Sequence, residues 1–343
     1  MTRHKKVVVV ALVGASILVF LKRKDDFANM RDRAQWLLVP TLARIAAPLT
    51  LHFTGWKDRL YAPTFLTKID SLYFIVDCWH NRVLYSPTVD APIATWRLLD
   101  DGLAGPHSIA SDSVLYVVED TGRHGLRVYT HLGGTFQCVQ TIAGLGRRTH
   151  RVAYDAASSA FYALSSDSQQ ITKLIREADR LRVLYRKPLP FLGTAYTRSF
   201  TIADDSMFFV SGSNTITKTR YLDDSYQVLA TYYMPLPLQG MNDLFKSGKY
   251  YYLTATPKTI IRTTSIQSIG EGHWQNIYGV LGFKGTPYYM AEFDGRIFVP
   301  QIFEDSGILS FVEHDGAIED VRTLFDSGRP TLMDREVRFS LPK

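Results

Sequence analysis

The stretch GPHSIASDSVLYVVEDTGRHGLRVYT, Gly105 to Thr130, decides the fold. A Gly-Pro turn leads into His107 and a short apolar strand, and a polar turn leads into a second strand that ends in Asp120. A polar loop follows, and the third strand opens on Arg127 and Val128. Short apolar segments separated by turn residues predict β-strands rather than helices.

The same order of features recurs along the chain. The segment YAPTFLTKIDSLYFIVDCWHNRVLYS, Tyr61 to Ser86, also has a proline before the first strand, an aspartate at the end of the second and Arg-Val at the start of the third. Weaker copies begin at four further positions: Thr149, Thr197, Met241 and Pro287. Equivalent positions in the six copies are separated by 43, 43, 48, 44 and 46 residues.

A period of this length holds four short strands with their turns, which is one blade of a β-propeller. The sequence therefore predicts an all-β, six-bladed β-propeller over residues 57–343. A β-sandwich would not keep so regular a spacing, and a β-helix would have a much shorter period. Residues 51–62 and 335–343 are expected to close the ring by sharing a blade.

The repeated pattern resembles the NHL repeat, and DCWHNRVLY, Asp77 to Tyr85, is its closest local match. The GPHSI segment is similar to repeats of the peptidyl-glycine amidating lyase. The N-terminal apolar segment before a propeller also resembles the strictosidine-synthase-like membrane proteins. The resemblance covers roughly residues 57–330, most clearly in the first two units, and it implies a fold far more than a function.

The N-terminus predicts a membrane anchor. Residues 7–21, VVVVALVGASILVFL, are uncharged and lie between basic segments. As a helix they span roughly 22 Å, and flanking Lys and Arg side chains can reach the interface of a bilayer core of about 30 Å. A cleaved signal peptide is the alternative, but Lys22-Arg23-Lys24 stand where small residues are required. Residues 1–24 are therefore expected to hold the chain in the bilayer, with the N-terminus in the cytosol and the propeller on the non-cytosolic side.

A second apolar run, Trp36 to Phe53, is interrupted by Pro40, Arg44 and Pro48. A spanning helix would bury Arg44, so residues 25–56 are expected to form an amphipathic linker helix. The formal charge of +6 lies largely near the N-terminus, so the body shows no nucleic-acid footprint. The two cysteines, Cys78 and Cys138, fall in different repeats and indicate no zinc cluster, although one disulfide is an open alternative.

In a propeller the first strand of each blade lines the central channel. Six polar residues at equivalent strand starts are expected to surround the channel mouth: Thr64, His107, His150, Arg198, Asn242 and Tyr288. Asp243, one residue further along, and Trp79, in the loop after Asp77, are expected to share this mouth. Asp77 and Asp120 themselves are expected to cap their loops.

His107 and His150 come from adjacent blades, and imidazole is a common zinc ligand. The resemblance to the lyase favours such a site, whereas the gluconolactonase and paraoxonase type of propeller holds calcium with Glu, Asn and Asp oxygens. The ring has no third histidine, and only Asn242 and Asp243 offer such oxygens. Zinc or calcium at the histidines is one hypothesis, and ring closure by hydrogen bonds to backbone or water is the other.

Arg198 requires a partner in a narrow channel. Asp243 is the expected structural partner, and an anionic ligand such as a carboxylate or phosphate is the functional alternative. Trp79 is expected either to stack on a glycan or aromatic ligand or to pack between blades.

Three functions remain open from the sequence. The first is a membrane-anchored module that binds a ligand or partner at the channel mouth. The second is a metal-dependent lyase or lactonase-type hydrolase that uses the mouth histidines, with Tyr288 as acid or base. The third is a structural subunit of a membrane assembly that docks through Trp36 to Trp56.

Overall fold

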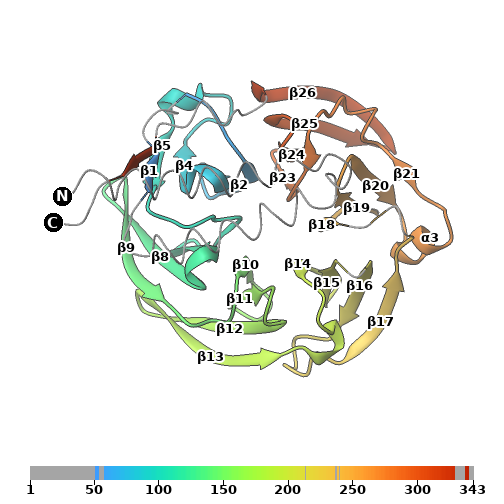
Figure 1. The fold of residues 1–343 in the computed structure, drawn as a ribbon, viewed down its shortest axis with the longest axis horizontal. Helices are drawn as coiled ribbons and strands as arrows, with labels where there is room; N and C mark the ends of the chain where they lie inside the picture. Colours follow the sequence, from blue (N-terminus) through green and yellow to red (C-terminus); the bar gives the residue numbers. More distant parts are fainter. Residues whose placement is uncertain are drawn as a thin grey trace, which may run out of the picture. The chain divides into compact units, whose positions relative to one another are not determined.

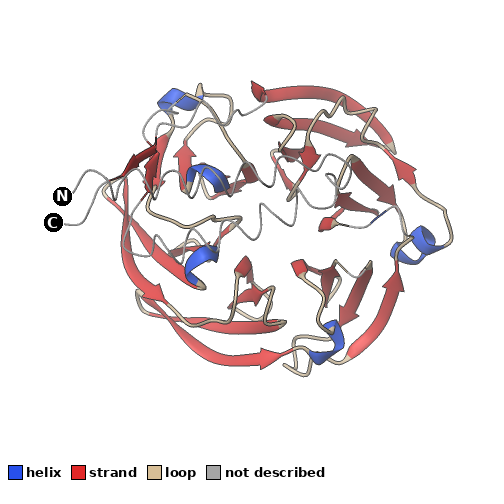
Figure 2. Cartoon of the chain, viewed as in Figure 1, coloured by secondary structure: helices blue, strands red, loops and turns tan. Residues whose placement is uncertain are grey.

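The six predicted repeats form six sheets around a common centre in the computed structural model of the chain (Figure 1). The structure describes residues 58–328 except 213, 236, 237 and 239, together with the backbone of two short strands at 51–53 and 337–339. Residues 51–338 form one compact unit. The prediction of an all-β six-bladed propeller is confirmed, and short helical turns lie in the connections between strands (Figure 2).

Each blade is an antiparallel sheet whose strands follow one another along the chain. The strands of blades 1 to 3 are β2 (Pro63–Ile69), β3 (Leu72–Asp77), β4 (Arg82–Ser86) and β5 (Arg97–Asp100); β6 (Ile109–Ser111), β7 (Leu115–Asp120), β8 (Gly125–Leu132) and β9 (Thr135–Ile142); and β10 (Thr149–Asp155), β11 (Ala160–Ser165), β12 (Gln170–Glu177) and β13 (Arg180–Pro188). The strands of blades 4 to 6 are β14 (Thr197–Ala203), β15 (Ser206–Ser211), β16 (Thr215–Thr219) and β17 (Val228–Tyr233); β18 (Met241–Ser247), β19 (Tyr250–Ala255), β20 (Thr259–Thr263) and β21 (Gln275–Asn276); and β22 (Thr286–Pro287), β23 (Ala291–Phe293), β24 (Arg296–Ile302), β25 (Ser306–His314) and β26 (Ala317–Gly328).

The second strand of each blade is apolar on both of its faces because a neighbouring blade covers each face. In β3, Phe74 packs with residues of blade 2, whereas the next residue, Ile75, packs with residues of blade 6. The buried apolar residues form six clusters, one for each interface between adjacent blades. The hydrophobic core is therefore a ring of interfaces rather than one central mass.

Asp77, at the end of β3, braces the start of its own blade. Its Oδ1 accepts hydrogen bonds from the main-chain N–H groups of Tyr61 (3.0 Å) and Ala62 (2.9 Å). Its Oδ2 accepts one from Nε of Arg82 (3.0 Å) and lies 2.6 Å from Nδ1 of His80. Burial alone would raise the pKa of this carboxyl, but His80 and Arg82 hold its pKa well below the ordinary range.

Asp120 repeats this arrangement in blade 2, where it accepts from the main-chain N–H of Ala104 (2.7 Å) and from Nε of Arg127 (3.2 Å). Gln301 does the same in blade 6 through the N–H of Gly285 (3.0 Å). The expectation that the aspartates cap their own loops is therefore only partly right, because they chiefly hold the segment that precedes the first strand. The recurring Asp…Arg-Val pattern of the first two units therefore corresponds to this arrangement, in which the aspartate bonds both to the segment before the first strand and to the arginine of the third strand.

Ring closure differs from the expectation that the chain ends share a blade. Blade 1 and blade 6 each have a full set of strands, and β1 (Leu51–Phe53) pairs with β27 (Val337–Phe339) in a separate two-stranded sheet. The two blades instead join directly. Ser306 Oγ donates to the Tyr61 carbonyl (2.5 Å), and the N–H of Leu60 donates to Ser327 Oγ (2.9 Å).

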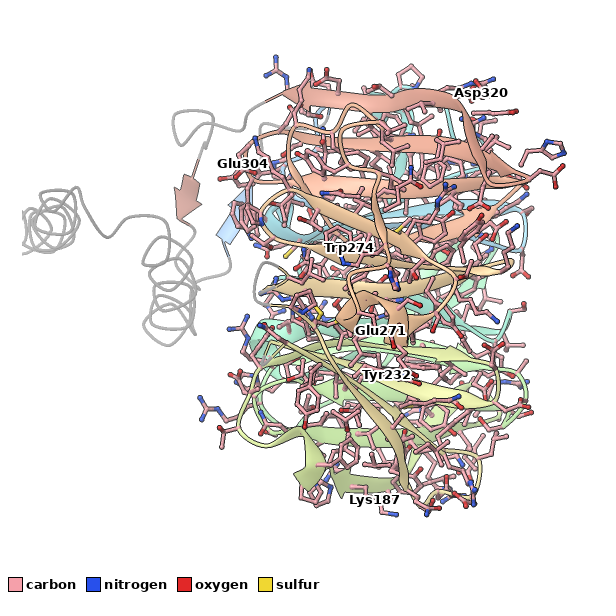
Figure 3. The ribbon with its side chains drawn as sticks, turned by 90° about the vertical axis from the view of Figure 1, so that its right-hand side faces the viewer. Lys187, Tyr232, Glu271, Trp274, Glu304 and Asp320 are labelled. Atoms are coloured by element: carbon pink, nitrogen blue, oxygen red, sulfur yellow. The ribbon has the colours of Figure 1, made fainter. Side chains whose placement is uncertain are left out.

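The two faces of the propeller carry different connections. Figure 3 shows the strands from the side, with Glu304 of the β24–β25 connection at one end and Asp320 toward the other. At the end opposite Glu304, aspartates in the first turns of blades 6 and 4 accept hydrogen bonds from the next blade. Asp294 accepts from Lys68 (2.5 Å) and from the Tyr73 hydroxyl (2.7 Å), and Asp204 accepts from Lys246 and the Tyr251 hydroxyl.

The anchor predicted at residues 7–21 lies outside the described residues, and so does nearly all of the linker predicted at residues 25–56. Residues 51–53 are an exception, since they form strand β1 instead of the expected helix. Within the described ranges, no helix has both the length and the apolarity that crossing a membrane requires.

Replacing Asp77 with Asn is expected to destabilise the fold, because it leaves the Arg82 guanidinium buried without its counter-charge. The expected loss in the free energy of unfolding is about 3–5 kcal/mol, measured by urea titration of the full chain. Since the folded-state pKa of Asp77 lies below its unfolded value of 3.8, the stability it contributes is fully present above pH 3.8 and is lost as the pH falls from there through the folded-state pKa.

The matched control is Asp101→Asn in an exposed position of the β5–β6 connection, which is expected to change stability by less than about 0.5 kcal/mol. Two results would contradict this role of Asp77. One is an equal free energy of unfolding in the two variants, and the other is the same loss of stability at low pH in Asp77→Asn as in the native chain.

Candidate functional site

Six polar residues lie at the starts of the six inner strands and form what we call the mouth ring: Thr64, His107, His150, Arg198, Asn242 and Tyr288. In four blades the strand pairing skips the ring residue, which marks a β-bulge at that position. In blade 2 the first strand begins only at Ile109, and in blade 6 the strand is interrupted between β22 and β23, where Tyr288 keeps one main-chain hydrogen bond to Pro300 (2.9 Å). A bulge redirects one side chain out of the regular alternation.

The mouth ring is continuous from blade to blade. Thr64 Oγ1 donates to the His107 carbonyl (3.0 Å), and the His107 and His150 rings lie with centroids 3.9 Å apart. His150 Nδ1 is 2.9 Å from the Arg198 carbonyl oxygen, and Arg198 Nη1 donates to Asn242 Oδ1 (2.9 Å).

The remaining contacts close the circle. Asn242 Nδ2 donates to the Pro287 carbonyl (2.8 Å), and the N–H of Tyr289 donates to the Thr64 carbonyl (3.2 Å). Contacts at all six blade interfaces thus bring the ring residues together, with Tyr288 placed by its neighbours Pro287 and Tyr289 and by its ring contact with His107 (centroids 6.0 Å apart). Ligand binding by these six residues stays a prediction.

The ring is more enclosed than an open channel mouth. Five members are at most 4% exposed, and only Arg198 is half-buried. Two further residues, Arg148 and Tyr196, are also half-buried and lie beside it: the guanidinium of Arg148 is 5.1 Å and that of Arg198 is 5.5 Å from the Tyr196 ring centroid. We call Arg148, Tyr196 and Arg198 the outer cluster.

Sequence reasoning missed Arg148 and Tyr196, although a signal was present. Each stands two residues before a ring member, His150 and Arg198 respectively. Side chains two positions apart along a strand share a face, so residues at this offset are candidates for the layer next to the ring.

The electrostatic environment keeps both ring histidines neutral. Burial lowers the pKa of His107 well below its ordinary value, and the nearby charges of Arg148 and Arg198 lower it further. Burial also lowers the pKa of His150, with further contributions from His107 and the same two arginines. A cation close to a histidine disfavours the imidazolium form, and an anion bound there would have the opposite effect.

The hydrogen bonds of His150 fix its tautomer. Nδ1 lies 2.9 Å from the carbonyl oxygen of Arg198, which can only accept, and 2.8 Å from the Tyr289 hydroxyl. The Tyr289 hydroxyl donates to that same carbonyl oxygen (3.0 Å), so Nδ1 faces two oxygens that can accept its proton. The proton of neutral His150 therefore resides on Nδ1, and Nε2 carries a lone pair. Among the described residues, this Nε2 and the hydroxyl of Tyr288 are buried and have no hydrogen-bond partner.

Glu119 is a second functional candidate that sequence reasoning missed. This fully buried side chain accepts hydrogen bonds from the main-chain N–H groups of His107 and Ser108 and from the Ser108 hydroxyl. Burial raises its pKa well above the ordinary value. Because a side chain takes these N–H groups, the regular pairing of blade 2 starts later than in the other blades. A glutamate inside the apolar strand LYVVED was the available signal.

Asp243 is not the partner of Arg198 that the sequence suggested. It lies one residue further along β18 than the ring residue Asn242, and its Oδ2 accepts a hydrogen bond from the Met290 N–H (3.2 Å). Burial raises the pKa of Asp243 to about 6, against the lowering effect of Arg151. The guanidinium of Arg151 stacks on the Tyr289 ring at 4.3 Å.

Trp79 lies away from the ring, half-buried between blades 1 and 6. Its ring meets Tyr61 edge-on at 5.1 Å and Phe303 at 5.3 Å. These contacts match the packing alternative. Stacking of Trp79 on a ligand has no support in them.

The donor set does not fit the zinc or calcium site considered for His107 and His150. In the part of the chain that the structure describes, no three His, Cys, Asp or Glu side chains are grouped so that they could hold a metal ion. The two imidazoles lie against each other at an interplanar angle of 31°, Asn242 Oδ1 accepts from Arg198, and Asp243 Oδ2 accepts from the Met290 N–H. Cys78 and Cys138 are free thiols, the first buried and the second exposed, so the alternative of a disulfide between them is wrong.

Comparison with protein-family models and with curated proteins returned no match. Solved structures do match in fold. A candidate 6-phosphogluconolactonase from Bacteroides uniformis ATCC 8492 has a TM-score of 0.56 at 14% identity and aligns over 76% of this chain and 85% of its own. Another from Bacteroides fragilis NCTC 9343 has a TM-score of 0.54 at 15% identity, over 81% and 87%.

Hydrazine synthase of Kuenenia stuttgartiensis has a TM-score of 0.51 at 14% identity, over 73% of this chain and 77% of its own. The expected distant likeness to other β-propellers is confirmed. At these identities it shows the fold alone, and 1250 matching chains are too many for the fold to indicate one activity.

The neutrality of the ring histidines is directly measurable. We expect the imidazole NMR signals of His107 and His150 to stay at their neutral positions between about pH 5.5 and 8, because burial and two guanidinium groups oppose protonation. The solvent-exposed His314 supplies a reference signal in the same sample. Titration of either ring histidine near the ordinary value of 6.5 would show that the mouth lacks this positive potential.

Proposed function

We propose that this protein is a propeller that binds a small anionic, hydroxyl-bearing ligand at the mouth ring. The observation that carries the proposal is the pairing of two arginines with a buried, neutral His150 whose Nε2 is left without a partner among the described residues. An unpaired buried polar atom costs about 1–3 kcal/mol, which a ligand that bonds to it would offset.

The available groups specify the ligand chemistry. The guanidinium groups of Arg148 and Arg198 are suited to a carboxylate or phosphate, which they can bind with paired N–H donors. The lone pair on His150 Nε2 accepts a hydrogen bond from a hydroxyl, and the Tyr288 hydroxyl can donate one. A sugar acid or a sugar phosphate combines these features. A neutral glycan lacks the anionic group and is the weaker choice.

A lactonase-type hydrolase is a second candidate, in which the mouth histidines act without a metal. Two solved propellers of similar fold carry the description candidate 6-phosphogluconolactonase, and their assigned substrate is an anionic lactone. Neutral imidazoles with a free lone pair are the form required of a general base. His150 supplies that form at the ring, next to guanidinium groups that could stabilise an oxyanion.

We also propose that residues 7–21 anchor the chain in the lipid bilayer, with the propeller on the non-cytosolic side. The support is the uncharged run between basic segments and the more basic N-terminal flank. The full chain is expected to stay in the membrane pellet after an alkaline carbonate wash, and a chain lacking residues 1–24 is expected to leave it. Recovery of the full chain in the soluble fraction would refute the anchor.

Ligand binding is tested by calorimetry with 6-phosphogluconate, gluconate and glucose. We expect both anions to bind and glucose not to bind. Arg198→Gln and Arg148→Gln are each expected to weaken 6-phosphogluconate binding roughly 10- to 100-fold, which is the loss of one charged hydrogen-bond partner. The matched control is Arg147→Gln, an exposed arginine adjacent to Arg148, which should leave affinity within about twofold.

Glucose binding as tightly as the anions would contradict the electrostatic basis of the site. Equal losses in Arg147→Gln and Arg148→Gln would place the anion on the outer surface rather than at the mouth ring. Either result would remove the proposal.

A further inference from the structure

Cys78 lies in the apolar cluster between blades 1 and 2, where its thiol also contacts a mouth-ring residue. It opens the short helical turn η1 (Cys78–His80) between the second and third strands of blade 1. Its side chain is 4% exposed, and its Sγ lies 3.6 Å from Nε2 of His107 in blade 2. This separation lies within the range for a hydrogen bond to sulfur. Two neighbouring blades thus bring a thiol to an imidazole.

The other side of the His107 ring determines which nitrogen faces the thiol. Nδ1 lies 3.1 Å from Thr121 Oγ1 and 3.7 Å from Glu119 Oε1. Thr121 Oγ1 is the group within hydrogen-bond distance of Nδ1 and can accept from it, which places the proton of the neutral ring on Nδ1. Neutral His107 then has its lone pair on Nε2, directed at Cys78. The Cys78 thiol, the His107 imidazole and the Thr121 hydroxyl therefore lie in a row. This is the arrangement of a nucleophile, its general base and the group that orients the base.

A buried hydroxyl without a hydrogen-bond partner among the described residues lies on the same side of the mouth ring. The Tyr288 ring stacks on His107 with centroids 6.0 Å apart, and its hydroxyl is buried with no hydrogen-bond partner among the described residues. Arg148 is close enough to act electrostatically on both Cys78 and His107. Four groups therefore lie around one part of the mouth ring: a thiol, a base, an unsatisfied hydroxyl donor and a cation.

We propose that Cys78 is the nucleophile of an acyl-transfer reaction on an anionic ester, thioester or lactone, with His107 as its general base. Thr121 and Glu119 are positioning residues, since they act through His107. The inference rests on the hydrolase candidate for the same mouth ring and specifies its nucleophile and substrate class.

The step balances without a cofactor. Cys78 gives its proton to His107 Nε2 as sulfur bonds to the acyl carbon, and the carbonyl oxygen becomes an oxyanion beside Arg148 or the Tyr288 hydroxyl. When the tetrahedral intermediate collapses, the bond to the alkoxide or thiolate leaving group breaks, and that group takes the proton from His107. Water, deprotonated by the same imidazole, then hydrolyses the thioester and restores the thiol.

Burial gives this thiol a distinctive signature. It raises the pKa of Cys78, with a further contribution from Glu119, so the free protein holds a thiol rather than a preformed thiolate. Simple alkylating reagents, which need a thiolate, should therefore react slowly with Cys78 and faster with the exposed Cys138. Only a substrate held in the mouth ring should reverse that order, because it places its acyl carbon where His107 can remove the proton.

The test compares two esters of equal chain length on the full wild-type chain: mono-4-nitrophenyl adipate, which carries a carboxylate, and neutral 4-nitrophenyl hexanoate. We expect a burst of nitrophenol from the adipate ester and an adipoyl group on Cys78 by peptide mapping. The anionic ester should react at least about tenfold faster than the neutral one. His107→Gln should slow the burst about 100-fold, and Cys138→Ser should leave it unchanged. Iodoacetamide should label Cys138 first.

The outcomes separate this inference from the function it rests on. Turnover of the adipate ester with no acyl group on Cys78 and with full activity in Cys78→Ser would overturn the cysteine but keep the hydrolase. Binding of 6-phosphogluconate without any reaction of either ester would overturn acyl transfer and keep the anion site. Acylation confined to Cys138 or to lysines would also overturn the proposal. Mapping on the wild-type chain decides these cases even if Cys78→Ser fails to fold.

Discussion

The closed circle of contacts through the mouth ring is the constraint on which the structure of this site depends. In four blades the inner strand begins with a ring residue that the regular pairing leaves out, and ring residues or their neighbours bond or stack to the next blade. The circle includes only one stacked pair, His107 and His150, while the other interfaces use hydrogen bonds. Apolar side chains fill most of each blade interface, and this ring is where polar groups from six distant segments meet at the axis. Where these groups lack a partner among the described residues, as at His150 Nε2 and the Tyr288 hydroxyl, the fold retains a cost that a ligand can offset.

Two kinds of buried polar residue do different work in this propeller. Asp77, Asp120 and Gln301 have their partners within their own blade, and they fix the approach to the first strand. The ring residues have partners in neighbouring blades and lie among cations that keep the histidines neutral. The first kind is fully paired and explains stability. The second kind is partly unpaired, and this is the pattern expected where a structure gives up some stability for binding or chemistry.

Much of the fold could be predicted from the sequence, because it follows from the regular spacing of apolar strands. The spacing of the strand starts also identified the six ring residues, since equivalent positions in a radial repeat converge. It could not show that the ring is enclosed, because burial depends on how bulged side chains meet across blades. The prediction that Asp243 pairs with Arg198 was wrong for the same reason. Asp243 lies one residue beyond the ring position on β18 and bonds to Met290, and Asn242 at the ring position bonds to Arg198 instead. Arg148 was missed because its contact with Tyr196 crosses between blades, whereas Glu119 was missed because its bonds to the N–H groups of His107 and Ser108 replace strand pairing within blade 2. Closure of the ring by a shared blade was wrong because each blade is complete in itself.

The central claim is that six strand starts create one positively charged, anion-binding ring. The most direct measurement is anomalous diffraction from crystals of the protein soaked in selenate. The account predicts a selenium peak whose oxygens lie about 3 Å from the Arg198 guanidinium, next to the His150 ring. Selenate bound only at outer surface lysines and arginines, with the mouth ring empty, would contradict it.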